Sequence, residues 1–153
     1  MEFGRTMSSA HLKLQQKYDN WNPSLKNVKL VDLCFQLGKN YVEYDYRRKA
    51  LEVVQKMVDT AKDINFKLSF EQMILHSDLL IKPDDNNAPT LSGSNYGINP
   101  RSNLEYIWKN LEDMKARNFR PKQIIAGEAH LAIAYYRYLC SNLVKYVCFI
   151  SNV

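Results

Sequence analysis

Three histidines and one closely spaced acid–histidine pair are the first candidates for metal binding or catalysis. His11, His76 and His130 are scattered along the chain, and none has a cysteine at metal-ligand spacing. Glu128 and His130 are two residues apart, which places them on different faces of a helix, unlike a zinc-binding histidine pair four residues apart. The glycine-containing segment 93–97 lacks the Lys-Ser/Thr pair of a phosphate-binding loop. We therefore expect no enzymatic activity, metal, cofactor or small-molecule substrate.

Basic residues form two clusters that could contact the phosphates of a polyanion. The first lies at the predicted start of a helix, where positive charge opposes the helix dipole, so that either an outside partner or solvent must favour it. The second lies in segment 101–122, which has six basic and three acidic residues. These seven candidate phosphate contacts are Arg47, Arg48, Lys49, Lys115, Arg117, Arg120 and Lys122.

Composition sets the class of protein that carries these clusters. The 153 residues are 46% hydrophobic and 24% charged, which is typical of a globular domain and excludes a disordered tail. A net charge of +5 permits a polyanionic partner. Only 5 Gly and 5 Pro argue against a turn-rich β-barrel, and three cysteines are too few for a disulfide framework. No apolar run is long enough to predict a membrane span, and residues 1–9 lack the apolar core that a secretory signal needs.

Hydrophobic residues recur at three- and four-residue spacing, and no strand pattern competes, so the predicted fold is all-α with about six or seven helices. We expect residues 1–9 to form a flexible tail and 10–153 to form one helical-repeat domain. Segment 82–100, with three prolines and two glycines, predicts a long polar loop. The predicted helices are 9–21, 24–37 (or on to 41), 47–62, 69–80, 102–120 and 122–141.

An internal repeat relates two of these helices. Residues 50–57, Ala-Leu-Glu-Val-Val-Gln-Lys-Met, align with residues 107–114, Ile-Trp-Lys-Asn-Leu-Glu-Asp-Met, and each helix is followed by an Asn-Phe-basic turn at Asn65 and Asn118. The two methionines are 57 residues apart. Without the 19 residues of the loop and four additional residues before the first turn, the period is 34, which is typical of helix-turn-helix solenoid repeats.

Residues 50–57 and 114–121 resemble the second helix and closing turn of pentatricopeptide repeats, and tetratricopeptide repeats are the close alternative. The resemblance covers about residues 31–122. It implies a right-handed superhelix of antiparallel helix pairs and binding of single-stranded RNA, in a mitochondrial setting. The base-reading positions of the family would correspond to Phe35, Ile74 and Gly127 in the first helices, and to Ser69 (or Asn65) and Lys122 at the turns.

The family usually has Asn, Ser or Thr where this chain has Phe35, Ile74 and Gly127, so we expect binding to the RNA backbone rather than base reading. Stacking by Tyr41, Tyr44 and Tyr46 would add to it. The leading hypothesis is thus a helical-repeat protein of organellar RNA metabolism or translation. The alternative is a non-enzymatic interaction scaffold that belongs to a larger assembly and binds a peptide or partner helix in its groove.

Overall fold

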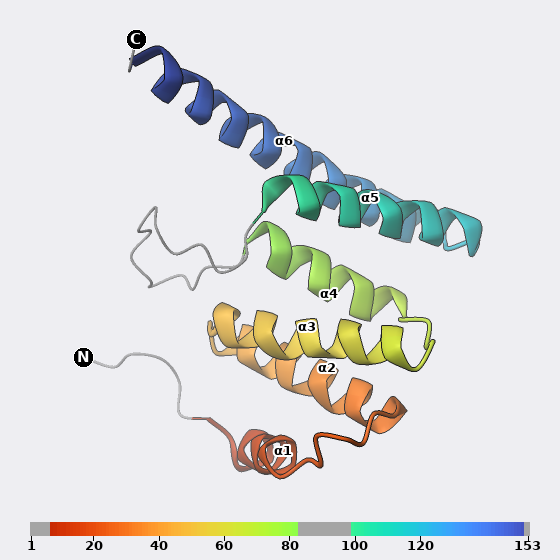
Figure 1. The fold of residues 1–153 in the computed structure, drawn as a ribbon. Coiled ribbons are helices and arrows are strands. Elements are labelled where there is room, and N and C mark those ends of the chain that lie inside the picture. Colours follow the sequence, from red (N-terminus) through yellow and green to blue (C-terminus); the bar gives the residue numbers. More distant parts are fainter. Residues whose placement is uncertain (1–6, 83–98, 152–153) are drawn as a thin grey trace. The chain divides into compact units, whose positions relative to one another are not determined.

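The computed structural model describes residues 7–82 and 99–151, and within these stretches it contains six helices and no strand (Figure 1). Residues 1–6 of the expected tail and 83–98 of the expected loop lie outside the described residues. The all-α prediction is confirmed, and the fold is compatible with an α-solenoid. The helices are α1 (Ser9–Asp19), α2 (Val28–Glu43), α3 (Arg47–Asp63), α4 (Phe70–Ile81), α5 (Pro100–Ala116) and α6 (Pro121–Ser151).

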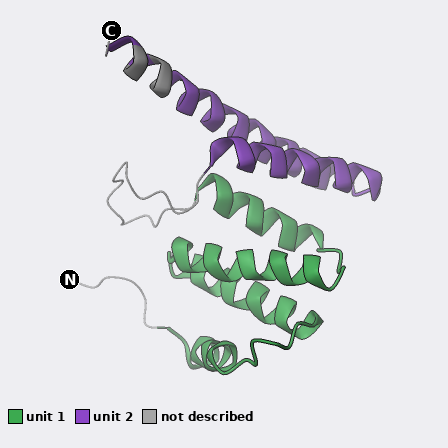
Figure 2. Cartoon of the chain, viewed as in Figure 1, with its two compact units in different colours: residues 1–90 green, residues 91–153 purple. Residues whose placement is uncertain are grey.

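The chain divides into two compact units, residues 1–90 and 91–153 (Figure 2). In the first unit α2 and α3 form an antiparallel pair, with α1 packed on α2 and α4 packed on α3. In the second unit α5 and α6 form an antiparallel hairpin. The expectation of a single domain over residues 10–153 stays a prediction.

The core of the first unit forms where the apolar stripes of α2 and α3 meet. Leu37 of α2 and Val54 and Met57 of α3 are completely buried, as the three- and four-residue spacing predicts. Ala50 is also buried, and its small side chain lets the two helices approach closely. Apolar burial of this kind contributes about 25 cal/mol per Å² and stabilises the contact between the two helices.

Three helices end in the same turn, which places Asp45, Asn65 and Asn118 in the left-handed region with φ values of 62°, 54° and 55°. In each turn the N–H of the next residue, an aromatic, donates to the carbonyl five residues earlier, and the N–H of the Asp or Asn donates to the carbonyl three residues earlier. This hydrogen-bond pattern is the Schellman motif. The expected Asn turns are thus confirmed, and Asp45-Tyr46 is a third copy.

The start of α2 differs from the sequence expectation. Ser24 was expected to open this helix, but the helix begins at Val28, and the Asn27 side chain caps it by accepting from the N–H of Leu30. Ser24 instead belongs to a local turn, in which its N–H and hydroxyl both donate to Oδ1 of Asn22, at 3.0 and 2.8 Å. Such a local turn is a strong competitor for helix initiation.

Helix α6 is 31 residues long and extends to Ser151, ten residues beyond its predicted end. No Pro or Gly interrupts residues 128–151, so nothing in the local sequence stops the helix. Within the described residues, no helix has the combination of length and hydrophobicity that crossing a bilayer requires.

Candidate nucleic-acid interface

The turn between α5 and α6 brings together Lys115, Arg117, Arg120 and Lys122. The Schellman motif at Asn118 ends α5, and α6 begins three residues later at Pro121. Four cations therefore lie within eight residues around one turn. The N-terminus of α6 adds the positive end of a helix dipole to the same region.

Two of these cations have partners in their own helix. Nζ of Lys115 lies 3.7 Å from Oε1 of Glu112, and Nη1 of Arg117 lies 3.2 Å from Oδ2 of Asp113. The Arg117 guanidinium also lies over the Phe119 ring, 4.7 Å from its centroid. Both cations are at the C-terminal end of α5, where they stabilise the helix dipole. A structural role therefore accounts for much of their placement.

Arg120 and Lys122 are placed differently. Both are exposed, and both lie at the N-terminal end of α6, where their charge opposes the helix dipole. The Arg120 backbone is used locally, because its N–H donates to Oε1 of Gln123 at 3.0 Å and its carbonyl accepts from the N–H of Gln123 and Ile124. The helix dipole does not favour their charged ends, so either solvent or an external anion must do so.

The cluster at the start of α3 divides into different environments. Arg47 is buried, and its side chain holds α4: Nε donates to the carbonyl of Lys82 at 2.6 Å and Nη2 lies 2.7 Å from Oδ2 of Asp78. A guanidinium held in this way serves the fold. Arg48 is half-buried, whereas Lys49 is exposed, with its Nζ 5.6 Å from the centroid of the Tyr46 ring.

Two of the tyrosines expected to stack on bases, Tyr41 and Tyr44, instead make contacts within the protein. Tyr41 is 5% exposed, its hydroxyl donates to Gln15, and its ring contacts the His11 ring at 5.0 Å between centroids. The Tyr44 ring also contacts the His11 ring, at 5.6 Å between centroids, and the Tyr44 hydroxyl accepts from the N–H of Ser8. These contacts join α1 to the end of α2.

The positions that correspond to base-reading residues of pentatricopeptide repeats also lie inside the packing. Phe35 and Ile74 are half-buried, and Gly127 is buried against Leu111 and Met114 of α5. A Cβ at Gly127 would lie 3.0 Å from Cδ1 of Leu111, so its missing side chain allows α5 and α6 to cross closely. Recognition here would therefore rely on charge.

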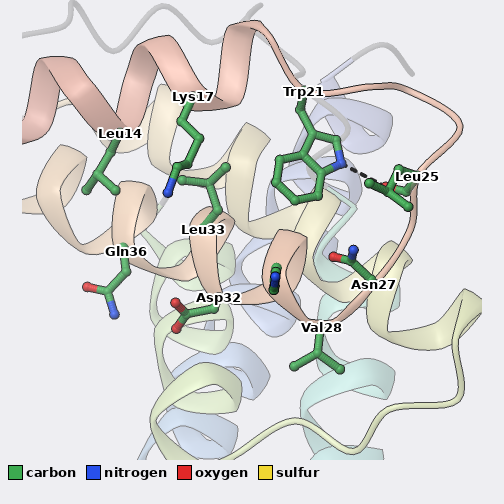
Figure 3. A pocket seen from close by; sticks show the side chains of 10 residues that line it. Leu14, Lys17, Trp21, Leu25, Asn27, Val28, Asp32, Leu33 and Gln36 are labelled. Carbon is green, nitrogen blue, oxygen red and sulfur yellow. Dashed lines mark hydrogen bonds between the residues drawn. The ribbon is translucent and has the colours of Figure 1, made fainter.

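An apolar groove of about 620 Å³ lies between α1 and α2 (Figure 3). Its walls include Leu14 and Trp21 on one side and Val28 and Leu33 on the other, with Lys17, Lys29 and Asp32 among the charged residues that line it. The Trp21 indole N–H donates to the carbonyl of Leu25 at 2.7 Å and so fixes the ring in the wall. The groove was not predicted from the sequence, where the only signal was a tryptophan, Trp21, four residues before the apolar Leu25.

Buried ionisable groups do not assemble into a reactive site in the described part of the chain. Burial lowers the pKa of His76 to about 4 and raises the pKa of the Cys34 thiol to about 11, so both are neutral at pH 7. Nε2 of His76 lies 3.1 Å from Oε1 of Gln55. Among the described residues, no group of three His, Cys, Asp or Glu side chains could hold a metal ion. The segment 93–97 lies outside the described residues.

Comparison with known proteins gives no relative for this chain: no family model, no curated protein and no solved structure matches it.

Proposed function

We propose that this chain is a non-enzymatic helical-repeat protein that binds single-stranded RNA through the basic turn between α5 and α6. The observation that carries the proposal is the pair of exposed cations, Arg120 and Lys122, at a helix start where the fold itself disfavours them. Lys115 and Arg117 add to the local potential, although each also has an acidic neighbour. The contacts would be with phosphates, so affinity would depend strongly on salt and weakly on base sequence.

The resemblance of residues 50–57 and 114–121 to pentatricopeptide repeats supports the same proposal. The proposal includes a right-handed superhelical arrangement of the helix pairs. It also includes a role in organellar RNA metabolism or translation, and the resemblance points to the mitochondrion. Arg47 is left out of the proposed contacts, because Asp78 and the Lys82 carbonyl already engage its guanidinium. Arg48 and Lys49 remain as candidate contacts of the first unit.

The test is fluorescence anisotropy of a labelled single-stranded RNA titrated with the full chain across a salt series. We expect a dissociation constant in the micromolar range or tighter at about 50 mM salt, with a steep loss of affinity as salt rises. The variant Arg120→Gln/Lys122→Gln should weaken binding by about tenfold and reduce the salt slope by about 1.4. The matched control is Lys13→Gln/Lys26→Gln, which removes two exposed cations from the first unit.

Two results would contradict the proposal: an absence of binding at about 50 mM salt, or equal effects of the two double variants. The second result would show that net charge matters and that the basic turn does not.

A second candidate function, a protein-interaction scaffold, is favoured by the groove between α1 and α2. Leu25 and Val28 are 48% and 51% exposed beside it, so a partner's apolar segment would find uncovered side chains there. Val28→Glu should release the chain from a larger native assembly in size fractionation, whereas Leu12→Glu, at a similarly exposed position of α1, should not. A chain that fractionates at its own mass before any substitution would exclude this second function.

A further inference from the structure

Helix α6 has two apolar faces, and α5 covers only one of them. Gly127 and Ala134 are buried on the covered face, seven residues apart and therefore two helical turns apart on the same side. Gly127 contacts Leu111 and Met114 of α5 there. The opposite side of the helix carries a second stripe of exposed apolar residues, which we call the α6 seam: Ile125, Ala129, Ala132, Tyr136, Leu139, Leu143, Val147 and Ile150.

The large side chains of this seam are exposed to an unusual degree. Ile125, Tyr136 and Leu143 are 62%, 67% and 62% exposed, and Leu139 and Ile150 are 46% and 53% exposed. Isolated exposed apolar residues are ordinary on a protein surface, but a contiguous stripe of them marks an interface. The stripe runs from residue 125 to residue 150, which is about 38 Å at 1.5 Å per residue.

The spacing of the seam is that of a coiled coil. From Ile125 to Leu143 the intervals are four, three, four, three and four residues, which is the heptad pattern of two helices that pack along this stretch. The side of α6 that packs on α5 lies opposite to the α6 seam. Helix α6 can therefore pair with α5 and with another helix at the same time.

The charge along the seam restricts its partner. Among the described side chains from Ile125 to Ile150, Glu128 and Arg137 are the charged ones, and they lie about a sixth and about a third of a turn away from the centre of the seam. Two copies of this surface would therefore meet without like-charge repulsion.

Side-chain size decides the orientation of such a pair. In a parallel pair each residue would face its own copy, so Ala129 and Ala132 would form two consecutive layers of small side chains and leave a gap. In an antiparallel pair centred between Arg137 and Tyr138, Ala132 faces Leu143 of the other copy. Tyr136 then faces Leu139, and Ile125 faces Ile150. The Ala132–Leu143 and Tyr136–Leu139 layers combine side chains of different size, which avoids the gap of the parallel pair.

We propose that the α6 seam is a dimerisation surface and that its partner is the α6 helix of a second copy of this chain, packed antiparallel. This goes beyond the proposed function, since the basic turn at Arg120 and Lys122 lies before the seam begins, and RNA binding and self-association can succeed or fail separately. The dimer is isologous, as a twofold axis through the centre of the paired helices requires.

Sedimentation equilibrium of the full chain over a range of concentrations tests the proposal. We expect a monomer–dimer equilibrium with a dissociation constant in the micromolar range or tighter. Leu143→Glu should weaken the dimer by at least a hundredfold, because it puts a carboxylate opposite Ala132 in both symmetric layers. Leu12→Glu is the matched control, with the same change at an apolar position of α1 that is 54% exposed, and it should leave the equilibrium unchanged.

Disulfide trapping tests the orientation, in a Cys140→Ser/Cys148→Ser background. Ala132→Cys protein mixed with Leu143→Cys protein should form a cross-linked heterodimer on oxidation, and Ala132→Cys protein alone should not cross-link. Three results would overturn the proposal. These are a wild-type chain that stays monomeric up to about 100 µM, an equal effect of Leu143→Glu and Leu12→Glu, and cross-linking of Ala132→Cys to itself. A wild-type monomer that pairs only with a helix of a different protein also counts against it.

Discussion

Gly38 of α2 lies so close to Val54 of α3 that a Cβ atom on Gly38 would overlap Cγ2 of Val54. Both residues are completely or almost completely buried, at the centre of the contact between the two helices. The glycine therefore determines how closely α2 and α3 approach, and it lies within the helix although glycine normally weakens one. The same relationship holds in the second unit between Gly127 and Leu111, with more room.

Replacing Gly38 with alanine should destabilise the chain. A methyl group forces the Val54 side chain or the two backbones apart, at a cost of about 1–3 kcal/mol that exceeds the roughly 1 kcal/mol gained from helix propensity. Urea unfolding followed by circular dichroism measures the change. Gly127→Ala is the matched control: its nearest neighbours, at 3.0 and 3.2 Å, are the flexible ends of Leu111 and Met114, so we expect a smaller loss or none. Equal losses would contradict the packing argument.

We expect the contact of Arg47 with Asp78 to stabilise the fold rather than to take part in RNA binding. The side chain of Arg47 is 10% exposed, and Arg47→Ala leaves the Lys82 carbonyl and the Asp78 carboxylate without this donor. We expect the free energy of unfolding to fall by about 3 kcal/mol and RNA affinity to change little. Lys26→Ala removes the ion pair between Lys26 and Asp63, in which the two side chains are 52% and 47% exposed. This variant should lower the free energy of unfolding by under about 1 kcal/mol. Similar losses in the two variants would mean that Arg47 does not anchor α4.

The left-handed turn at Asn118 gives a third prediction. Its φ of 55° suits glycine and is strained for a residue whose side chain is branched at Cβ. Asn118→Gly should leave stability nearly unchanged, whereas Asn118→Val should lower the melting temperature, because the left-handed conformation costs about 1–2 kcal/mol. Thermal unfolding of the two variants side by side checks this. A Val variant as stable as the Gly variant would show that α5 does not need this turn.

Protonation of His76 should make stability depend on pH. Its pKa is about 4 in the folded chain, against 6.5 for an exposed histidine, because burial disfavours the charged ring. Between these two values the unfolded chain binds more protons than the folded chain, so stability is complete above pH 6.5 and is lost as the pH falls towards 4. We expect a loss of about 2 kcal/mol between pH 7 and pH 5 from this residue.

The same unfolding measurement on His76→Gln isolates this histidine, since all other groups titrate equally in the two proteins. The difference in stability between pH 7 and pH 5 should be smaller in the variant by that amount. An identical pH dependence would show that His76 is protonated without opening the fold.

Local sequence predicted most of the helices, and it failed where distant residues or competing turns decide. Ser69 caps α4 as expected, because its hydroxyl and the Gln72 side chain form a capping box within four residues. The predicted start of α2 was wrong because residues 22–24 form a local turn and Asn27, rather than Ser24, caps the helix. The predicted end of α6 was also wrong: the helix continues to Ser151, because the sequence after residue 141 contains no stop signal.

The candidate site could likewise be predicted only where its residues are neighbours in sequence. Lys115, Arg117, Arg120 and Lys122 are neighbours in sequence, so a single helix–helix turn necessarily brings them together. The burial of Arg47 could not be predicted, since its partner Asp78 is 31 residues away on another helix. The groove between α1 and α2 depends on how two helices pack, which apolar periodicity alone does not specify.

The self-contained turns at Asp45, Asn65 and Asn118 have a consequence for how the chain acquires its fold. Each turn satisfies the last carbonyls of its helix with nearby N–H groups, so the end of the helix can form before the helix packs against its neighbours. Adjacent helices then pack as hairpins, and contacts between nearby residues dominate, as in chains of low contact order. Either hairpin can serve as the nucleus, and folding should be fast without requiring one particular order of assembly.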